Sequence, residues 1–246
     1  MISNKKKPLI LIGENASKDI LYALEQYGFE TVILPADTRL ASPVNSHADM
    51  LVFVLNKNIF CNKTYFEHNK ELFARIAKHG YTLLPCDFNV KTNYPHDIAL
   101  NQAIVGRYIF GNKSYCSKEL LKYANENGYF YVSVKQGYAK CSTLVLNKNA
   151  IISADDSILS AARALNIDTL KIENAEGLII LNGYDYGFIG GASAVYENTV
   201  FFFGSIDRHK SGRSIIEFCE RHGMRTFSLT DDFLTDIGGA FILPLL

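Results

Sequence analysis

The residues best suited to covalent chemistry are a cysteine and the lysine that precedes it. In the stretch 135–152, KQGYAKCSTLVLNKNAII, Lys140 and Cys141 stand at the start of an apolar run. An adjacent ammonium group lowers the pKa of a thiol, and the thiolate is a nucleophile that a histidine can assist as acid and base. The alternative is a small apolar residue on the buried side of the strand, since free cysteines are often simply buried. Neighbouring side chains on a strand point to opposite faces, so only one of the two would face a site.

Two histidine–aspartate pairs offer the acid and base. His47 and Asp49 are two residues apart, so on a strand they share one face, where the carboxylate can orient and charge the imidazole. His96 and Asp97 are adjacent and would face opposite ways. Loop and turn roles are the alternatives, because aspartates often stabilise turns. We therefore take His47 and His96 as the candidate acid/base partners of Cys141.

Further polar residues lie just before the predicted strands and are candidates for ligand binding. They are Asp49, Asp97, Asn101, Lys140, Ser193 and Asp236. Carboxylates of this set would suit a guanidinium or an ammonium group. The sequence has no H-x-H or H-E-x-x-H spacing, so we predict no metal site. It also has no G-x-G-x-x-G or Walker pattern, so we expect no nucleotide cofactor.

Five helical patterns along the chain end at residues that tolerate the left-handed conformation, and their spacing indicates a repeat. These residues are Gly28, Gly80, Gly128, Asn166 and Gly223. With the two chain ends joined, their mean spacing is about 49 residues, within the range typical of repeat arrays. The helices after the first are predicted over residues 65–79, 117–127, 156–165 and 211–222. Two strands precede each helix and one follows it; the first strand of the second unit is predicted over residues 98–105.

A duplicated turn supports this repeat. Residues 54–59, VLNKNI, nearly match residues 145–150, VLNKNA. Aligning the two copies places Lys140 opposite Asp49 and Cys141 opposite Met50. The fifth unit is predicted to be split, with residues 236–243 giving its first strand and residues 8–13 its second. Pairing the two ends in one sheet closes a ring and removes free edges.

We therefore predict an α/β protein of five ββαβ repeats in a closed, pseudo-five-fold propeller, formed by residues 1–246 as one domain. The helices would lie outside and the polar strand entrances would face a central channel. A doubly wound α/β domain is the alternative, because alternating strands and helices are common.

This layout resembles the pentein fold of the guanidino-group-modifying enzymes, which include arginine deiminase, dimethylarginine hydrolase and amidinotransferases. The same fold serves the ribosome anti-association factor, which is not an enzyme. The runs QGYAKCS and GYDYGFIGG are also similar to a bacterial branch of that fold of unknown function. The resemblance implies a nucleophilic cysteine in a C-terminal G-G-x-H-C pattern, but this chain has Phe241 and Ile242 at the last two positions. Isoleucine cannot attack a guanidinium carbon, so no catalytic residue carries over there.

Composition narrows the function classes. Lysine plus arginine equals aspartate plus glutamate, 25 each, which gives no electrostatic reason to expect nucleic acid or an anionic membrane as partner. The five cysteines form no C-x-x-C pair, which favours reduced thiols in a cytoplasm. We expect binding, and perhaps hydrolase- or amidinotransferase-like modification, of a small guanidino- or amino-acid-like ligand. The alternative is a non-catalytic binding or assembly protein on the same scaffold.

Overall fold

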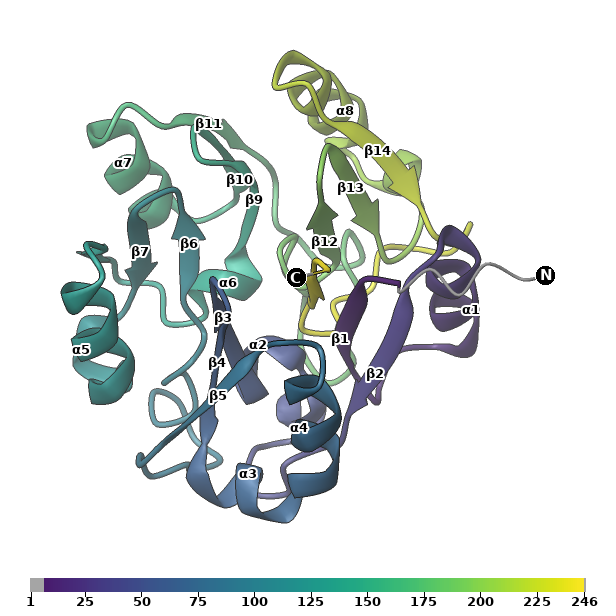
Figure 1. The fold of residues 1–246 in the computed structure, drawn as a ribbon. Coiled ribbons are helices and arrows are strands. Elements are labelled where there is room, and N and C mark those ends of the chain that lie inside the picture. Colours follow the sequence, from purple (N-terminus) through teal and green to yellow (C-terminus); the bar gives the residue numbers. More distant parts are fainter. Residues whose placement is uncertain (1–6, 246) are drawn as a thin grey trace.

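The computed structural model describes residues 7–245 and has five three-stranded sheets arranged around a central axis, with helices on the outside (Figure 1). In every sheet the first strand pairs antiparallel with the second, and the second pairs parallel with the third. A helix connects the second and third strands of each unit. The predicted ring of five ββαβ repeats is thus confirmed.

Four of the units are continuous in the chain. The first contains β3 (Val52–Leu55), β4 (Asn58–Asn62), α3 (Lys63–His68), α4 (Lys70–Ala77) and β5 (Thr82–Cys86). The second contains β6 (Ala103–Val105), β7 (Tyr108–Gly111), α5 (Lys118–Glu126) and β8 (Phe130–Ser133). The third contains β9 (Thr143–Asn147), β10 (Ala150–Ser153), α7 (Asp156–Ala164) and β11 (Asp168–Lys171). The fourth contains β12 (Ser193–Tyr196), β13 (Thr199–Phe202), α8 (Gly212–Arg221) and β14 (Arg225–Ser228).

The fifth unit is split between the two ends of the chain, as predicted. It contains β15 (Ala240–Leu243), β1 (Leu9–Gly13), α1 (Lys18–Tyr27) and β2 (Glu30–Leu34). Strand β15 pairs antiparallel with β1, with Leu9 opposite Leu243 and Ile12 opposite Ala240. All five residues of β1, LILIG, are buried, because one face packs with α1 and the fourth unit and the other packs with the first unit.

The outer helices begin and end at residues suited to those positions. The side chains of Ser17, Ser117 and Asp155 accept hydrogen bonds from the free N–H groups at the starts of α1, α5 and α7. Asn166, predicted to end α7 in the left-handed conformation, has φ 58°. The helix predicted over residues 65–79 is instead two helices, because the chain leaves helical geometry at Asn69, with φ −124° and ψ 32°.

Short helical turns precede two of the inner strands and correct the predicted strand entrances. Residues Ala48–Leu51 form α2 and Ala139–Ser142 form α6. The two turns align position by position, with Asp49 matching Lys140. Strand β6 likewise begins only at Ala103, not at residue 98. The side-chain alternation expected for strands therefore does not apply to these polar residues.

The duplicated turn sequences do not have the same register. The first hairpin turns at Asn56 and Lys57, with Leu55 opposite Asn58. In the second, Asn147 is opposite Ala150, and a register shift follows between Ala150 and Ile151. The shift does not restore the register of the first hairpin, because Val145 pairs with Ile151, whereas the matching Val54 pairs with Ile59, the counterpart of Ala150.

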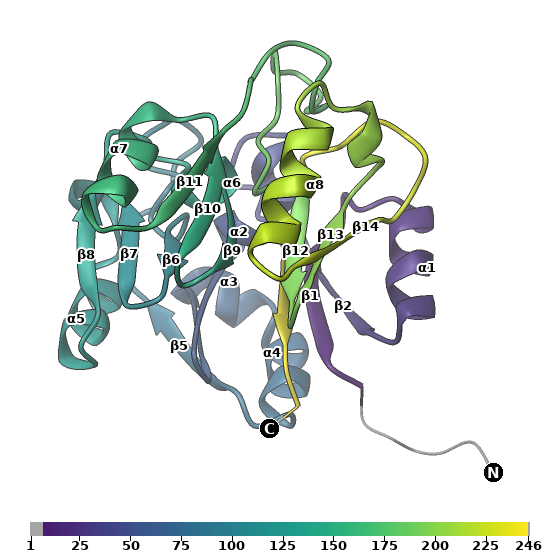
Figure 2. The ribbon, with the colours of Figure 1, turned by 90° about the horizontal axis from the view of Figure 1, so that it is seen from above.

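The connection between β11 and β12 stands out from one end of the ring (Figure 2). It is held by a parallel bridge between Ile180 and Thr235 and by a hydrogen bond from Gly187 N to the Ile179 carbonyl. In the part of the chain that the structure describes, no helix has the length and apolar character needed to cross a membrane. All five cysteines are buried free thiols.

Candidate functional site

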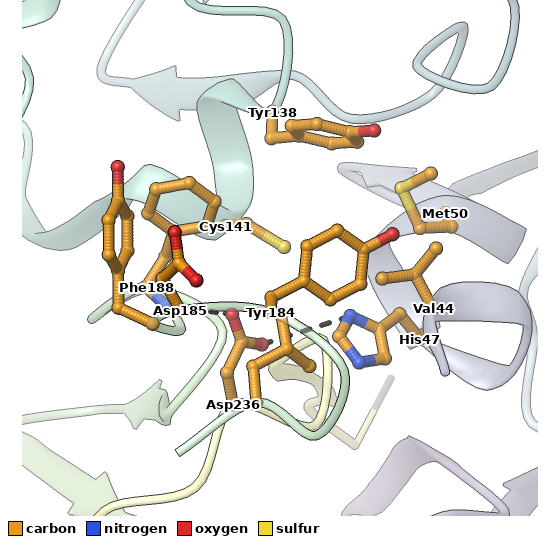
Figure 3. Close-up of a pocket in the computed structure, with 11 residues that line it drawn as sticks. Val44, His47, Met50, Tyr138, Cys141, Tyr184, Asp185, Phe188 and Asp236 are labelled. Carbon is orange, nitrogen blue, oxygen red and sulfur yellow. Dashed lines mark hydrogen bonds and ion pairs between the residues drawn. The ribbon is translucent and has the colours of Figure 1, made fainter. Parts of the chain in front are cut away.

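Three side chains from distant parts of the sequence meet at the end of the ring beneath this connection (Figure 3). Each of Cys141, His47 and Asp236 offers one atom (sulfur, ring nitrogen or carboxylate oxygen), and these atoms all lie within 4.8 Å of one another. The exposed fractions of the three residues are only 4%, 1% and 2%. The structure thus brings together a thiol, an imidazole and a carboxylate, a set able to perform nucleophilic and acid/base chemistry.

The helical turns and a buried asparagine position the thiol. Cys141 lies on α6, and the Asn101 side-chain carbonyl accepts hydrogen bonds from the backbone N–H groups of Lys140 and Cys141 at 2.8 and 3.2 Å. The Asn101 amide nitrogen lies 3.3 Å from the Met50 sulfur and 3.6 Å from the Cys141 sulfur. Asn101 therefore fixes α6 against the neighbouring unit.

The carboxylate of Asp236 is held by backbone donors and surrounded by glycines. Its two oxygens accept hydrogen bonds from Phe188 N at 2.8 Å and Gly238 N at 2.9 Å. A Cβ atom at Gly191 would overlap with an oxygen of this carboxylate, and one at Gly238 would overlap with His47. Gly238 also has φ +79°, a conformation that side chains disfavour. These glycines leave the space that the cluster occupies.

The cluster lies at the floor of a cavity of about 230 Å³. Its lining residues are Val44, His47, Met50, Tyr138, Cys141, Leu181, Tyr184, Asp185, Tyr186, Phe188 and Asp236. Aromatic rings make much of the wall, and the exposed carboxylate of Asp185 lies on it as well. In the described part of the chain, this lining contains carboxylates but neither lysine nor arginine, so it favours a cation over an anion.

The Cys141 thiol donates a hydrogen bond to a carboxylate oxygen of Asp49 at 2.8 Å. Burial raises the pKa of Cys141 well above its usual value, and the negative charges of Asp49 and Asp236 raise it further. Burial also raises the pKa of Asp49 to about 7, although the nearby Lys140 ammonium opposes this shift. At neutral pH the sulfur is therefore a neutral thiol in the ligand-free protein.

The expected activation of Cys141 by Lys140 is wrong. The Lys140 ammonium donates a hydrogen bond to the Gly190 carbonyl at 3.0 Å and lies 5.9 Å from the centre of the Phe241 ring. It lines a second cavity, of about 250 Å³, among the inner strands β3, β9, β12 and β15. The two cavities share no lining residue, so Lys140 and Cys141 face different cavities.

His47 has an unusual environment for a buried histidine. Burial lowers its pKa, with a smaller opposing effect from Asp236, whose carboxylate oxygen is 3.8 Å from Nδ1. The imidazole is therefore neutral at pH 7. Within residues 7–245, neither ring nitrogen has a hydrogen-bond partner. The side chain is thus free to bind, or to exchange a proton with, a group that enters the cavity.

Three predicted site residues, His96, Asp97 and Ser193, lie apart from the cluster. His96 is exposed and packs edge-on against the Tyr115 ring, because the loop before Asp97 turns only the aspartate inward; it does not reach Cys141. The Asp97 carboxylate accepts a hydrogen bond from Tyr138 OH at 2.7 Å, behind the cavity wall. Ser193 donates to the Ile189 carbonyl and lines the second cavity with Lys140.

Sequence reasoning missed several residues of the wall, notably Phe188 and Met50. Phe188 belongs to the run Gly187-Phe188-Ile189-Gly190-Gly191, and such a glycine-rich run is typical of a close backbone approach. Met50 is the residue that the duplicated turn aligns with Cys141. The repeat alignment was therefore the available signal for it.

The ring of five ββαβ units and its central site define a protein of the pentein fold. Residues 11–241 match the family model of DUF6873, a family of unknown function, and the chain belongs to this family. A search of curated proteins finds no match.

Among solved structures, an inosamine-phosphate amidinotransferase from Streptomyces griseus is similar with a TM-score of 0.61 at 12% identity, over 97% of this chain and 94% of that one. DDAH from Pseudomonas aeruginosa, complexed with citrulline, is similar with a TM-score of 0.57 at 12% identity, over 96% and 99%. An amidinotransferase from Microseira wollei, of the saxitoxin biosynthetic pathway, has a TM-score of 0.56 at 14% identity, over 97% and 95%. At these identities the likeness shows the fold.

Proposed function

We propose that the chain binds a small cation of the guanidino or amidino class in the aromatic cavity and modifies it through the thiol of Cys141. The observation that carries this proposal is the meeting of Cys141, His47 and Asp236 at the cavity floor. The solved amidinotransferase and DDAH structures support a ligand of this class. We further propose that the chain acts as one domain in a cytoplasm, in keeping with its free thiols.

A cation suits the cavity on two physical grounds. Aromatic faces attract cations, most strongly where water is excluded, and Tyr138, Tyr184 and Phe188 lie on the wall. Carboxylates pair with guanidinium groups through charged hydrogen bonds, and Asp185 and Asp236 lie on the same lining. A carboxylate-bearing end of a ligand would have to point out of the cavity, since no cationic side chain lines it in the described chain.

The chemistry would proceed through a covalent adduct. The Cys141 sulfur attacks the central carbon of the guanidinium or amidinium group, and the thiol proton passes to the hydrogen-bonded Asp49. The bond from that carbon to the departing nitrogen breaks, and the departing amine takes up the same proton from Asp49, with the neutral His47 imidazole able to relay it. Water or an acceptor amine then displaces the sulfur. If water is the acceptor, the protein is a hydrolase; if an amine is the acceptor, it is an amidinotransferase.

The alternative is a binding protein without catalysis on the same scaffold. It is favoured by Phe241 and Ile242, which stand where the catalytic penteins have a histidine and a cysteine. The neutral state of the Cys141 thiol also favours it. In that case the cation would bind between the carboxylates and the rings, and no product would form.

A matched pair of alkylating agents tests the proposal. Chloroacetamidine is a cation of the proposed class, and chloroacetamide is its neutral counterpart. The rate of each agent with Cys141 is divided by the rate of the same agent with free glutathione. We expect this normalised rate to be more than about tenfold higher for the cation, because a bound cation favours the thiolate by more than about 1.4 kcal/mol. Peptide mass spectrometry locates the label, and the buried Cys219 serves as internal control. Equal normalised rates would refute the cationic site.

Catalysis needs a separate assay. We expect the protein to release ammonia or an amine from a panel of alkylguanidines, and Cys141→Ser to abolish this release. Cationic labelling without any turnover would select the non-catalytic alternative.

A further inference from the structure

Cys141, His47 and Asp236 have a second chemical capacity that goes beyond the proposed function. His47 is almost fully buried, and in the described chain neither of its nitrogens has a hydrogen-bond partner. Buried polar groups normally have hydrogen-bond partners, so a buried group without one needs a physical explanation. The thiol of Cys141 and the carboxylate of Asp236 face the same point as this imidazole (Figure 3).

We propose that these three side chains bind a thiophilic divalent metal ion of the zinc type, with one coordination position open to the aromatic cavity. Thiolate, imidazole and carboxylate are the side chains that bind Zn²⁺ in proteins. Three protein ligands and a fourth, open position are the pattern of zinc sites that act on a ligand, whereas structural sites use four protein ligands. Binding the ion releases the Cys141 proton to solvent.

The geometry is close to that of a four-coordinate site. Zinc bonds of about 2.0–2.3 Å place tetrahedral ligand atoms roughly 3.3–3.8 Å apart. Asp236 Oδ1 and His47 Nδ1 are already 3.8 Å apart, and all three ligand atoms lie within 4.8 Å. A contraction of about 1 Å at the widest pair, within reach of side-chain rotation, completes the site.

Outer contacts hold two of the three ligands in place, as is common around metal sites. Backbone N–H groups of Phe188 and Gly238 fix both oxygens of Asp236. Asn101 fixes the backbone of Cys141. Because these ligands are already oriented before the ion binds, the free-energy cost of assembling the site is lower.

The metal and the organic cation would exclude each other, because both occupy the space in front of the Cys141 sulfur. The cavity above the cluster leaves room for a water molecule or an anionic ligand in the open position. Binding of the metal ion would therefore either give the protein a second kind of ligand or prevent it from binding the organic cation.

Titration of the chelator-treated full-length protein with Co²⁺ tests the site, since Co²⁺ replaces Zn²⁺ and reports sulfur ligation by a charge-transfer band in the near ultraviolet. We expect one ion per chain and a band that Cys141→Ser removes. His47→Gln and Asp236→Asn should each weaken Zn²⁺ binding by more than about 100-fold, beyond the 10–100-fold loss typical of outer-contact variants. Cys219→Ser, which removes a buried thiol far from the cluster, is the matched control and should leave both readouts unchanged.

A wild-type protein without the charge-transfer band would overturn the proposal, as would a Cys141→Ser variant that keeps it. Circular dichroism of each variant shows whether it folds. If Asp236→Asn does not fold, protection of wild-type Cys141 from iodoacetamide by Zn²⁺ provides an independent readout, and unchanged alkylation in Zn²⁺ counts against the site. Chloroacetamidine labelling of the metal-free protein tests the organic cation separately, so either idea can fail alone.

Discussion

Replacing Asn101 with alanine should destabilise the protein and loosen the thiol at the same time. Asn101 is fully buried, and its carbonyl accepts two backbone N–H groups of α6. Leaving a buried donor without a partner costs about 1–3 kcal/mol, so two such donors cost about 2–6 kcal/mol. Whole domains are stable by only about 5–15 kcal/mol. We therefore expect the urea midpoint of Asn101→Ala to fall by about 1 M or more.

The chain offers a matched control in Asn62. This asparagine is also buried, its carbonyl accepts the backbone N–H groups of Thr64 and Tyr65 at 3.0 and 3.4 Å, and it does not line the cavity. Asn62→Ala should lose a similar amount of stability. Only Asn101→Ala should also raise the rate at which iodoacetamide alkylates Cys141, measured in conditions where both variants are folded. Equal alkylation rates in the two variants would show that Asn101 does not position the thiol.

Three further predictions concern other contacts. Burial raises the pKa of Asp97, so the folded state binds its proton more tightly than the unfolded state, and wild-type stability falls as pH rises from about 3.9 through the folded pKa. Urea titrations should show the advantage of Asp97→Asn over wild type growing across that window and then levelling; a constant difference would contradict this. Gly191→Ala should cost about 1–3 kcal/mol by overpacking, because its Cβ overlaps with Asp236, and should abolish chloroacetamidine labelling; retained labelling would show that the cluster adapts. Ser17→Ala removes the N-cap of α1 and should lower stability by about 1 kcal/mol in thermal unfolding, leaving labelling unchanged.

The fold could be predicted from sequence because its signals are local and recur. Helix ends at Gly28, Gly80, Gly128 and Gly223 have the positive φ that glycine accepts at little cost, and one such end in each unit reveals the period. The split unit followed from the same count. The break at Asn69 was missed because the hydrophobic pattern continues through it from α3 to α4.

The site could be predicted only in part because its members come from three units. Cys141, His47 and Asp236 were each singled out by residue type, but no spacing along the chain shows that they meet. The metal motifs sought were local ones, which cannot detect ligands at positions 47, 141 and 236. The predicted activation of Cys141 by Lys140 was wrong because a helical turn replaces the expected strand. The Lys140 ammonium therefore reaches the Gly190 carbonyl and the second cavity.

The pairing of β15 with β1 has a consequence for how the protein is made. Asp236 lies four residues before β15, so its carboxylate reaches the cluster as the last strand closes the ring. His47 and Cys141 leave the ribosome much earlier, and each meets the carboxylate only after residues 236–243 have emerged. A nascent chain thus carries an incomplete cluster until residues 236–243 have emerged and β15 has paired with β1.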